Sequence, residues 1–159
     1  MANNHKIMKV AIVGGTHGNE LTGVYLVKKW LKNGASIIGE SFKTTLLIAN
    51  ETAIENCTRY VDKDLNRCFT HKDLNGSECS DIEQARAREI NTILGPKGSA
   101  ESQDLIFDLH NTTANMGVTL IYSQVDELAK KILSKLNQNP LVNLYYMPEN
   151  LLDSPYLPS

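Results

Sequence analysis

Short apolar runs rich in β-branched residues alternate along this chain with longer segments that repeat their apolar residues every three or four positions. The short runs have the length and composition of buried strands, and the longer segments have the period of amphipathic helices. The expected strands are 9–13, 44–49, 104–109, 118–122 and 141–147, and the expected helices are 21–30, 80–94 and 126–136. Strands that alternate with helices predict an α/β fold, with a mixed or mostly parallel sheet flanked by helices.

Turn and cap residues separate these elements. Gly14 and Gly15 follow the first expected strand as a tight turn, and Gly34 stands past the end of the first helix as a stop signal. The stretch 80–83, Ser-Asp-Ile-Glu, has the spacing of a capping box and is expected to open the second helix. Residues 50–70 are rich in charge and Asn and have neither a helical nor a strand period, so we expect them to be irregular.

The composition is that of an ordinary soluble domain. Of 159 residues, 42% are hydrophobic and 21% are charged, which suffices for one domain with a core. The net charge of −2 gives no basic face for nucleic acid, and no apolar run approaches the length of a membrane span. The N-terminal stretch lacks the apolar core of a signal peptide, and three cysteines without a CxxC pair indicate reduced thiols. We therefore expect a cytoplasmic protein, and we leave open whether it forms a homo-oligomer.

Two histidines and a glutamate stand where metal ligands are expected. His17 and Glu20 follow the first strand, and their spacing lets both side chains approach one ion from the same turn. His110 follows the third expected strand, and α/β sheets place ligands beyond the carboxyl ends of their strands. Two His and one Glu form the ligand set of a catalytic zinc that keeps a position open for water. We expect one zinc per chain; the competing interpretation is a glycine-rich turn with an exposed His and a helix-capping Glu.

The segment 59–67 concentrates polar groups suited to a carboxylate substrate. Asn66 and Arg67 are adjacent and can grip one carboxylate, because Arg offers planar bidentate donors. Arg59 can stabilise the oxygen that becomes negative in a tetrahedral intermediate, and Asp64 can orient a zinc-bound imidazole. Taken by itself, however, the segment is better explained as a solvated loop with surface ion pairs; the metal site expected nearby is what favours the substrate role.

Polar residues also follow the third expected strand directly. Asn111 and Thr112 come after His110, at the edge where the zinc is expected. Their side chains either line the pocket beside the metal or cap the turn, and His110 has the alternative of an ordinary loop histidine. At the level of the residues alone, both interpretations stay open.

Three stretches of this sequence resemble the aspartoacylase and aminoacylase-3 family. They are Gly14–Glu20 (GGTHGNE), Arg59–Arg67 (RYVDKDLNR) and Asp108–Gly117 (DLHNTTANMG), in the family's order and spacing. Three long motifs in register are far more specific than one short pattern. The resemblance covers most of this chain, but only about the N-terminal half of the family's full length.

The resemblance implies a zinc-carboxypeptidase-like α/β fold and a defined reaction. A family member hydrolyses an N-acyl-L-amino acid, such as N-acetylaspartate or an N-acetyl aromatic amino acid, to a carboxylate and a free amino acid. The residues that match the family's zinc ligands are His17, Glu20 and His110. Asn66 and Arg67 match the pair that binds the substrate carboxylate. Arg59 matches the catalytic arginine that polarises the carbonyl, and Asp64 matches a carboxylate that orients an imidazole.

The sequence also departs from the family's pattern. The family's general base is a Glu in a Gly-x-Glu-x-Gly-Pro stretch, which these 159 residues do not contain, and nothing in them matches the family's C-terminal domain. We therefore expect residues 1–159 to form a truncated, N-terminal zinc-binding catalytic domain that is weakly active or inactive as it stands. The arginine that helps aspartoacylase hold an acidic substrate has no counterpart in 155–159, so the preference between aspartate and aromatic substrates stays open. Two other hypotheses remain, a zinc carboxypeptidase and a catalytically silent zinc-binding form.

Overall fold

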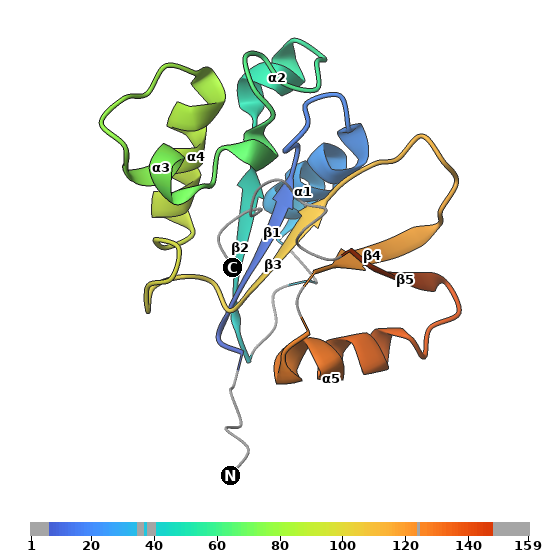
Figure 1. The fold of residues 1–159 in the computed structure, drawn as a ribbon. Coiled ribbons are helices and arrows are strands. Elements are labelled where there is room, and N and C mark those ends of the chain that lie inside the picture. Colours follow the sequence, from blue (N-terminus) through green and yellow to red (C-terminus); the bar gives the residue numbers. More distant parts are fainter. Residues whose placement is uncertain (1–6, 35–36, 38–40, 124, 148–159) are drawn as a thin grey trace. The chain divides into compact units, whose positions relative to one another are not determined.

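A computed structural model of the chain describes residues 7–34, 37, 41–123 and 125–147. These residues fall into two units: the larger unit extends to Asn111, and the smaller unit begins at Thr112. Each unit combines parallel strands with helices (Figure 1). The predicted α/β class is therefore confirmed, and every strand pair among the described residues is parallel.

The larger unit is built on a parallel sheet with the strand order β2-β1-β3 (Figure 1). β1 is Lys9–Gly14, β2 is Lys43–Ile48 and β3 is Leu105–Leu109. Gly14, the last residue of β1, pairs with Ile48 of β2 and with Leu109 of β3. Because the three strands end in register, the loops that follow them leave at one edge of the sheet, where α/β folds place their ligands.

Helices cover both faces of this sheet. On one face α1 (Leu21–Asn33) lies so close to β1 that a Cβ on Gly14 would stand 2.4 Å from the carbonyl oxygen of Gly23. Glycine at both positions allows the two backbones to approach this closely. Ala11 points to the opposite face, where α4 (Ile82–Ile93) packs. The core on that side consists of Ala11, Val13, Leu47, Ala49, Leu65, Cys68, Phe69, Ala87, Ile90 and Leu94.

Short helices occupy the segment between β2 and α4. They are α2 (Glu51–Glu55), the 3-10 helix η1 (Leu65–Arg67) and α3 (His71–Asn75). The prediction that 50–70 is irregular is therefore wrong in part. The first two helices begin at side-chain caps, since Asn50 accepts a backbone N–H in α2 and Asp64 accepts one in η1. Helices of about one turn bury too few residues to produce an apolar period, so the pattern gave no sign of them.

The predicted capping box at 80–83 is wrong. Helix α4 begins at Ile82 with Asp81 as its N-cap, and the Asp81 side chain makes no cap hydrogen bond. Glu83, the last residue of the motif, is fully buried and accepts hydrogen bonds from the loop 61–63. The backbone donors of that loop are better partners for a buried carboxylate than a helix end that is open to water.

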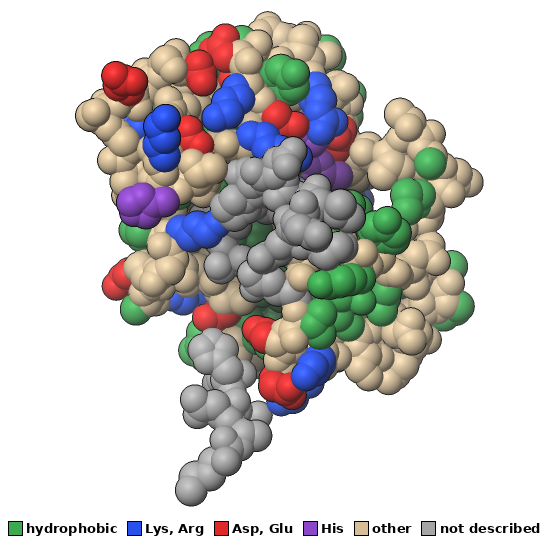
Figure 2. Space-filling model, viewed as in Figure 1, with side chains coloured by type: hydrophobic (Ala, Val, Ile, Leu, Met, Phe, Trp, Pro, Cys, Tyr) green, Lys and Arg blue, Asp and Glu red, His purple; other side chains and the backbone are tan. Residues whose placement is uncertain are grey.

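The smaller unit contains two parallel strands and a helix. β4 is Val118–Tyr122, α5 is Glu127–Leu136 and β5 is Val142–Tyr146. Asp126 caps α5, because its carboxylate accepts the backbone N–H of Ala129 at 2.7 Å. Apolar side chains that are exposed on this unit include Val118, Ile121, Leu141 and Tyr145. Figure 2 shows hydrophobic side chains at the surface of the molecule. None of the helices in the described ranges combines the length and the apolar character that crossing a bilayer requires.

Candidate metal centre

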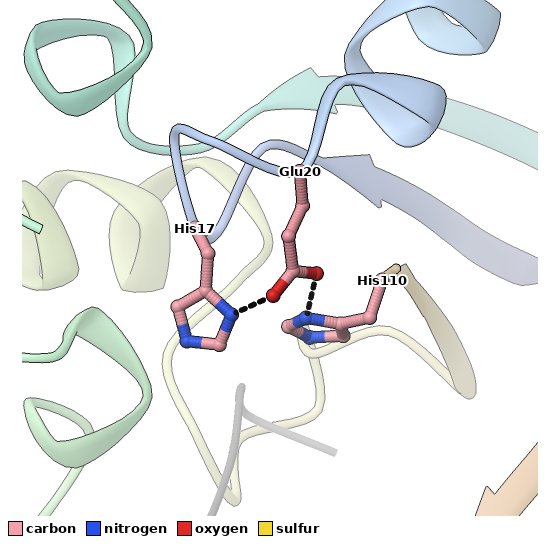
Figure 3. A group of neighbouring side chains, drawn as sticks. All are labelled: His17, Glu20 and His110. Atoms are coloured by element: carbon pink, nitrogen blue, oxygen red, sulfur yellow. Dashed lines mark hydrogen bonds and ion pairs between the residues drawn. The ribbon is translucent and has the colours of Figure 1, made fainter. Parts of the chain in front are cut away.

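The turn after β1 and the residue after β3 bring His17, Glu20 and His110 together (Figure 3). His17 and Glu20 lie between β1 and α1, and His110 directly follows β3. Because β1 and β3 are parallel neighbours, the loops that follow them meet at the same edge of the sheet. The structure thus brings together all three residues that the sequence suggested as zinc ligands.

Glu20 lies between the two imidazoles. Its Oε1 is 2.7 Å from Nδ1 of His17, and its Oε2 is 2.9 Å from Nδ1 of His110. The ligand atoms of the three residues lie within 4.8 Å of one another, a spacing compatible with one ion bound between them. Glu20 stands at the N-cap of α1, yet its side chain makes no cap hydrogen bond, and His17 is buried. The alternative of a capping Glu beside an exposed His therefore does not describe this turn.

A carboxylate contacts each imidazole on its other side. Nε2 of His17 lies 3.1 Å from Oδ1 of Asp64, and Nε2 of His110 lies 2.7 Å from Oδ2 of Asp108. A metal-binding imidazole usually donates its second N–H to a carboxylate in this way, which fixes the tautomer that offers the other nitrogen to the metal. The donor set and the carboxylates behind it therefore fit a zinc ion.

Asp108 is a residue of this cluster that the sequence analysis missed. It stands on β3, two positions before His110, and its Oδ1 accepts the hydroxyl of Thr16 at 2.7 Å. Thr16 is fully buried next to His17, so the Asp108 carboxylate is held from one side by the turn that also carries a candidate ligand. The spacing was the available signal, because residues two apart along a strand point to the same side.

The charges of the cluster favour a bound cation. Burial alone would lower the pKa of His110, but the hydrogen bond to Asp108 and the charges of Asp108 and Glu20 raise that pKa to about 9. Burial would raise the pKa of Glu20, but the Asn111 N–H and the two histidines hold it below its ordinary value. The pKa of Asp64 is also lowered, because the neighbouring imidazole outweighs burial. With ionised carboxylates and neutral imidazoles, as metal binding requires, the cluster carries negative charge.

Arg59 lies at the exposed rim of the cluster. Its guanidinium is 3.3 Å from Oδ2 of Asp64 and 3.5 Å from Oε1 of Glu20, and its side chain is 51% exposed. The backbone carbonyl of Arg59 accepts the N–H of Gly18 at 3.2 Å, which ties this loop to the metal turn. Arg59 can therefore reach a group bound at the cluster while half of its side chain stays in solvent.

Helix η1 carries Asn66 and Arg67 and is joined to the cluster by Asp64. Oδ1 of Asp64 accepts the Asn66 N–H at 3.0 Å and also faces His17. The Asn66 side chain is buried, and its amide oxygen has no hydrogen-bond partner in the part of the chain that the structure describes. The pair suggested for carboxylate binding thus begins two residues after a carboxylate that contacts a candidate metal ligand.

Asn111 acts as a cap, whereas Thr112 lies in the other unit. The Asn111 amide bonds to Thr22 at the start of α1, through Thr22 N–H to Oδ1 at 3.2 Å and through Nδ2 to the Thr22 hydroxyl at 2.8 Å. Its backbone N–H donates to Oε2 of Glu20 at 2.7 Å. Thr112 belongs to the smaller unit, where its hydroxyl donates to the carbonyl of Ala114 at 2.6 Å. A pocket-lining role for either side chain stays a prediction.

The sequence of this chain is similar to the sequences of known enzymes. The chain is 54% identical to an aspartoacylase of Rattus norvegicus over 117 residues, which cover 72% of this chain and 38% of that protein. It is 48% identical to a Homo sapiens N-acyl-aromatic-L-amino acid amidohydrolase (carboxylate-forming) over 124 residues, which cover 77% of this chain and 39% of that protein. The chain thus spans less than half the length of these relatives.

Solved structures and a family model of the same group of enzymes also match this chain. Murine aminoacylase 3 matches with a TM-score of 0.81 and 40% identity, over 92% of this chain and 49% of that chain. A succinylglutamate desuccinylase from Chromobacterium violaceum, with a TM-score of 0.65 and 21% identity, shares the fold alone. These likenesses confirm the zinc-carboxypeptidase-like α/β fold and the resemblance expected from the three sequence stretches. Residues 6–145 match the family model for the succinylglutamate desuccinylase/aspartoacylase catalytic domain, and the chain therefore belongs to this family.

Proposed function

We propose that this chain supplies the zinc-binding part of a zinc-dependent amidohydrolase, which hydrolyses N-acyl-L-amino acids to a carboxylate and a free amino acid. The observation that carries the proposal is the convergence of His17, Glu20 and His110, with a carboxylate against each imidazole. The names of the relatives, aspartoacylase and N-acyl-aromatic-L-amino acid amidohydrolase, support this substrate class. The proposal includes one zinc per chain and a cytoplasmic location.

The metal is held by neutral imidazoles and one carboxylate in this proposal. Zinc in such a site would lower the pKa of a water molecule and polarise a carbonyl group. With Asp64 against Nε2 of His17 and Asp108 against Nε2 of His110, each ring would donate its Nε2–H to a carboxylate and keep Nδ1 as the nitrogen available to zinc. Glu20 provides the negative charge that partly neutralises the cation.

The substrate is positioned by the loop that follows α2. Arg59, which already stands 3.5 Å from Glu20, turns its guanidinium toward the amide carbonyl oxygen and stabilises the negative charge that develops there. Asn66 and Arg67 bind the carboxylate of the amino-acid part, with the planar guanidinium as a bidentate donor. Aspartate and aromatic amino acids both remain candidates for that part.

A catalytically silent zinc-binding form is the second candidate. It would bind zinc at His17, Glu20 and His110 without hydrolysing an N-acyl amino acid. A zinc carboxypeptidase is the third candidate, and cleavage of a dipeptide distinguishes it.

Zinc binding and hydrolysis are tested separately on the purified chain. Equilibrium dialysis should find one zinc per wild-type chain and at least about tenfold weaker binding by Glu20→Gln, because a neutral amide is a poor zinc ligand. Glu55→Gln, a change at an exposed glutamate of α2, should bind zinc as the wild type does. The zinc-loaded chain is then assayed with N-acetylaspartate, an N-acetyl aromatic amino acid and a dipeptide. A wild-type chain that takes up no zinc would refute the proposal, and zinc uptake without turnover would favour the silent form.

A further inference from the structure

Glu83 is a fully buried carboxylate on the first turn of α4. Its Oε1 accepts the backbone N–H of Val61 at 2.7 Å and the side-chain amide of Asn50 at 3.0 Å. Its Oε2 accepts the backbone N–H groups of Asp62 at 3.0 Å and of Lys63 at 3.2 Å. A buried charge is tolerated only with such a set of donors, and three of these four belong to one loop.

Loop 61–63 and helix α4 are joined by hydrogen bonds that run in both directions. Asp62, whose N–H donates to Glu83, uses its own carboxylate to accept the backbone N–H of Ile82 at 3.0 Å. That N–H belongs to the first turn of α4, where the N-cap Asp81 makes no side-chain cap bond. Burial would raise the pKa of Glu83, but the donors from the loop and from Asn50 lower it, so the side chain stays ionised.

The residue that follows this clamped loop is Asp64. Its Oδ1 contacts Nε2 of His17 at 3.1 Å, so the position of the loop decides whether the carboxylate meets the imidazole. Asn50, the remaining partner of Glu83, donates its backbone N–H to the carbonyl of Gly15 at 3.0 Å, two residues before His17. Glu83 therefore binds the loop before Asp64 directly, and it is linked to the segment before His17 through Asn50.

We propose that Glu83 is a positioning residue for the metal centre, which holds loop 61–63 so that Asp64 meets His17. This inference rests on the proposed metal-binding function. The rival explanation is that Glu83 stabilises the fold without any particular effect on the cluster. The two differ in one respect: a positioning residue that acts through Asp64 has little effect on zinc binding once the Asp64 carboxylate is removed.

Glu83→Gln keeps the size of the side chain and replaces one acceptor oxygen by an NH₂ group that faces backbone N–H donors. We expect its zinc dissociation constant to rise about tenfold, the lower end of the range for groups that orient metal ligands. Glu89→Gln is the matched control, because Glu89 lies on the same helix with a side chain that is 62% exposed. The control should bind zinc as the wild type does.

A double-mutant comparison separates the two explanations. In an Asp64→Ala background, Glu83→Gln should weaken zinc binding by no more than about twofold, since the contact through which it acts is already lost. Multiplication of the two separate losses would overturn the proposal. Asp62→Ala, a change at an exposed residue that loosens the same loop, should also weaken zinc binding and should also lose most of its effect in the Asp64→Ala background. It provides the test if Glu83→Gln does not fold.

Amide hydrogen exchange on the metal-free chain gives a readout that does not depend on zinc. Glu83→Gln, or Asp62→Ala in its place, should accelerate exchange at 61–64 and leave the amides of β1 and β3 unchanged. Unchanged exchange at 61–64 would overturn the inference whatever the zinc titration gives. A wild-type chain with protected loop amides and no zinc binding would instead refute the proposed function and, with it, the link from Glu83 to a metal.

Discussion

Asp64 and His17 are joined by a contact of 3.1 Å between Oδ1 and Nε2, and the same carboxylate oxygen accepts the backbone N–H of Asn66 at 3.0 Å. One oxygen atom therefore connects a candidate metal ligand with the first turn of η1. A shift of the Asp64 carboxylate would therefore alter both the His17 imidazole and η1, the helix that carries the residues suggested to bind the substrate carboxylate. This makes Asp64 the natural first site for mutation.

Asp64→Ala should lower the affinity for zinc roughly 10–100-fold, because the imidazole of His17 loses the group that fixes its tautomer and orientation. The measurement is a zinc titration against a chelator of known affinity. Glu55→Ala, on an exposed position of α2, controls for the loss of one negative charge. Equal zinc occupancy of the two variants at limiting metal would assign Asp64 to an ordinary surface ion pair.

Asp108→Ala should weaken zinc binding to a similar extent, because Asp108 contacts Nε2 of His110 as Asp64 contacts Nε2 of His17. Thr16→Val removes only the hydroxyl that bonds to Asp108, and the loss of one hydrogen bond, worth about 1 kcal/mol, should weaken binding by about fivefold. Competition with a zinc chelator ranks the variants. A larger loss for Thr16→Val than for Asp108→Ala would contradict this order.

Zinc affinity should rise with pH around neutrality. The pKa of His110 is raised to about 9, so without a metal the imidazole is protonated at neutral pH and zinc must displace that proton. If one proton leaves, affinity increases about tenfold per pH unit between about pH 6 and 8. Asp108→Asn weakens the hydrogen bond and removes the charge that raise this pKa. The zinc affinity of that variant should therefore stop rising at a lower pH than the affinity of the wild type. A pH-independent dissociation constant for the wild type would contradict the expectation.

Glu83 should make stability depend on acid pH. Its pKa in the folded chain is lowered from 4.5, so the ionised carboxylate contributes stability that is fully present above about 4.5 and is lost as the pH falls through the folded value. Glu83→Gln lacks this contribution at every pH. The difference in the free energy of unfolding between wild type and variant, measured by urea titration, should therefore be largest near neutrality and shrink below pH 4.5. A difference that grows on acidification would mean that Glu83 is buried as the neutral acid.

The three candidate ligands could be identified from the sequence because they follow strands. His17 and Glu20 come after one apolar run and His110 after another, and parallel neighbouring strands end at the same edge. The flanking carboxylate Asp64 was suggested by its chemistry. Asp108 was accessible in principle from its spacing to His110, but a spacing of two does not say which acceptor a histidine will choose.

Contacts between segments far apart in sequence could not be read from local patterns. The capping-box spacing at 80–83 was sound as local chemistry, yet Glu83 bonds to loop 61–63, because folding brings unsatisfied backbone donors against it. In the same way, the N-cap residue Glu20 leaves the helix start to Asn111 and contacts the imidazoles instead. At both residues, contacts with distant segments replace the local roles that the spacing predicts.

Arg67→Lys should weaken the binding of carboxylate ligands to the zinc-loaded chain. Arg67 follows Asn66 on η1, and a lysine replaces its planar bidentate fork by a single point charge. A charge-assisted hydrogen bond is worth about 1.5–3 kcal/mol, so the loss of one should cost about tenfold or more in affinity. Calorimetric titration with N-acetylphenylalanine measures this loss, and N-acetylphenylalanine amide, which lacks the carboxylate, is the matched control ligand. The variant should bind the amide as the wild type does; an equal loss for both ligands would show that the substitution disturbs η1 as a whole and that Arg67 does not grip the carboxylate.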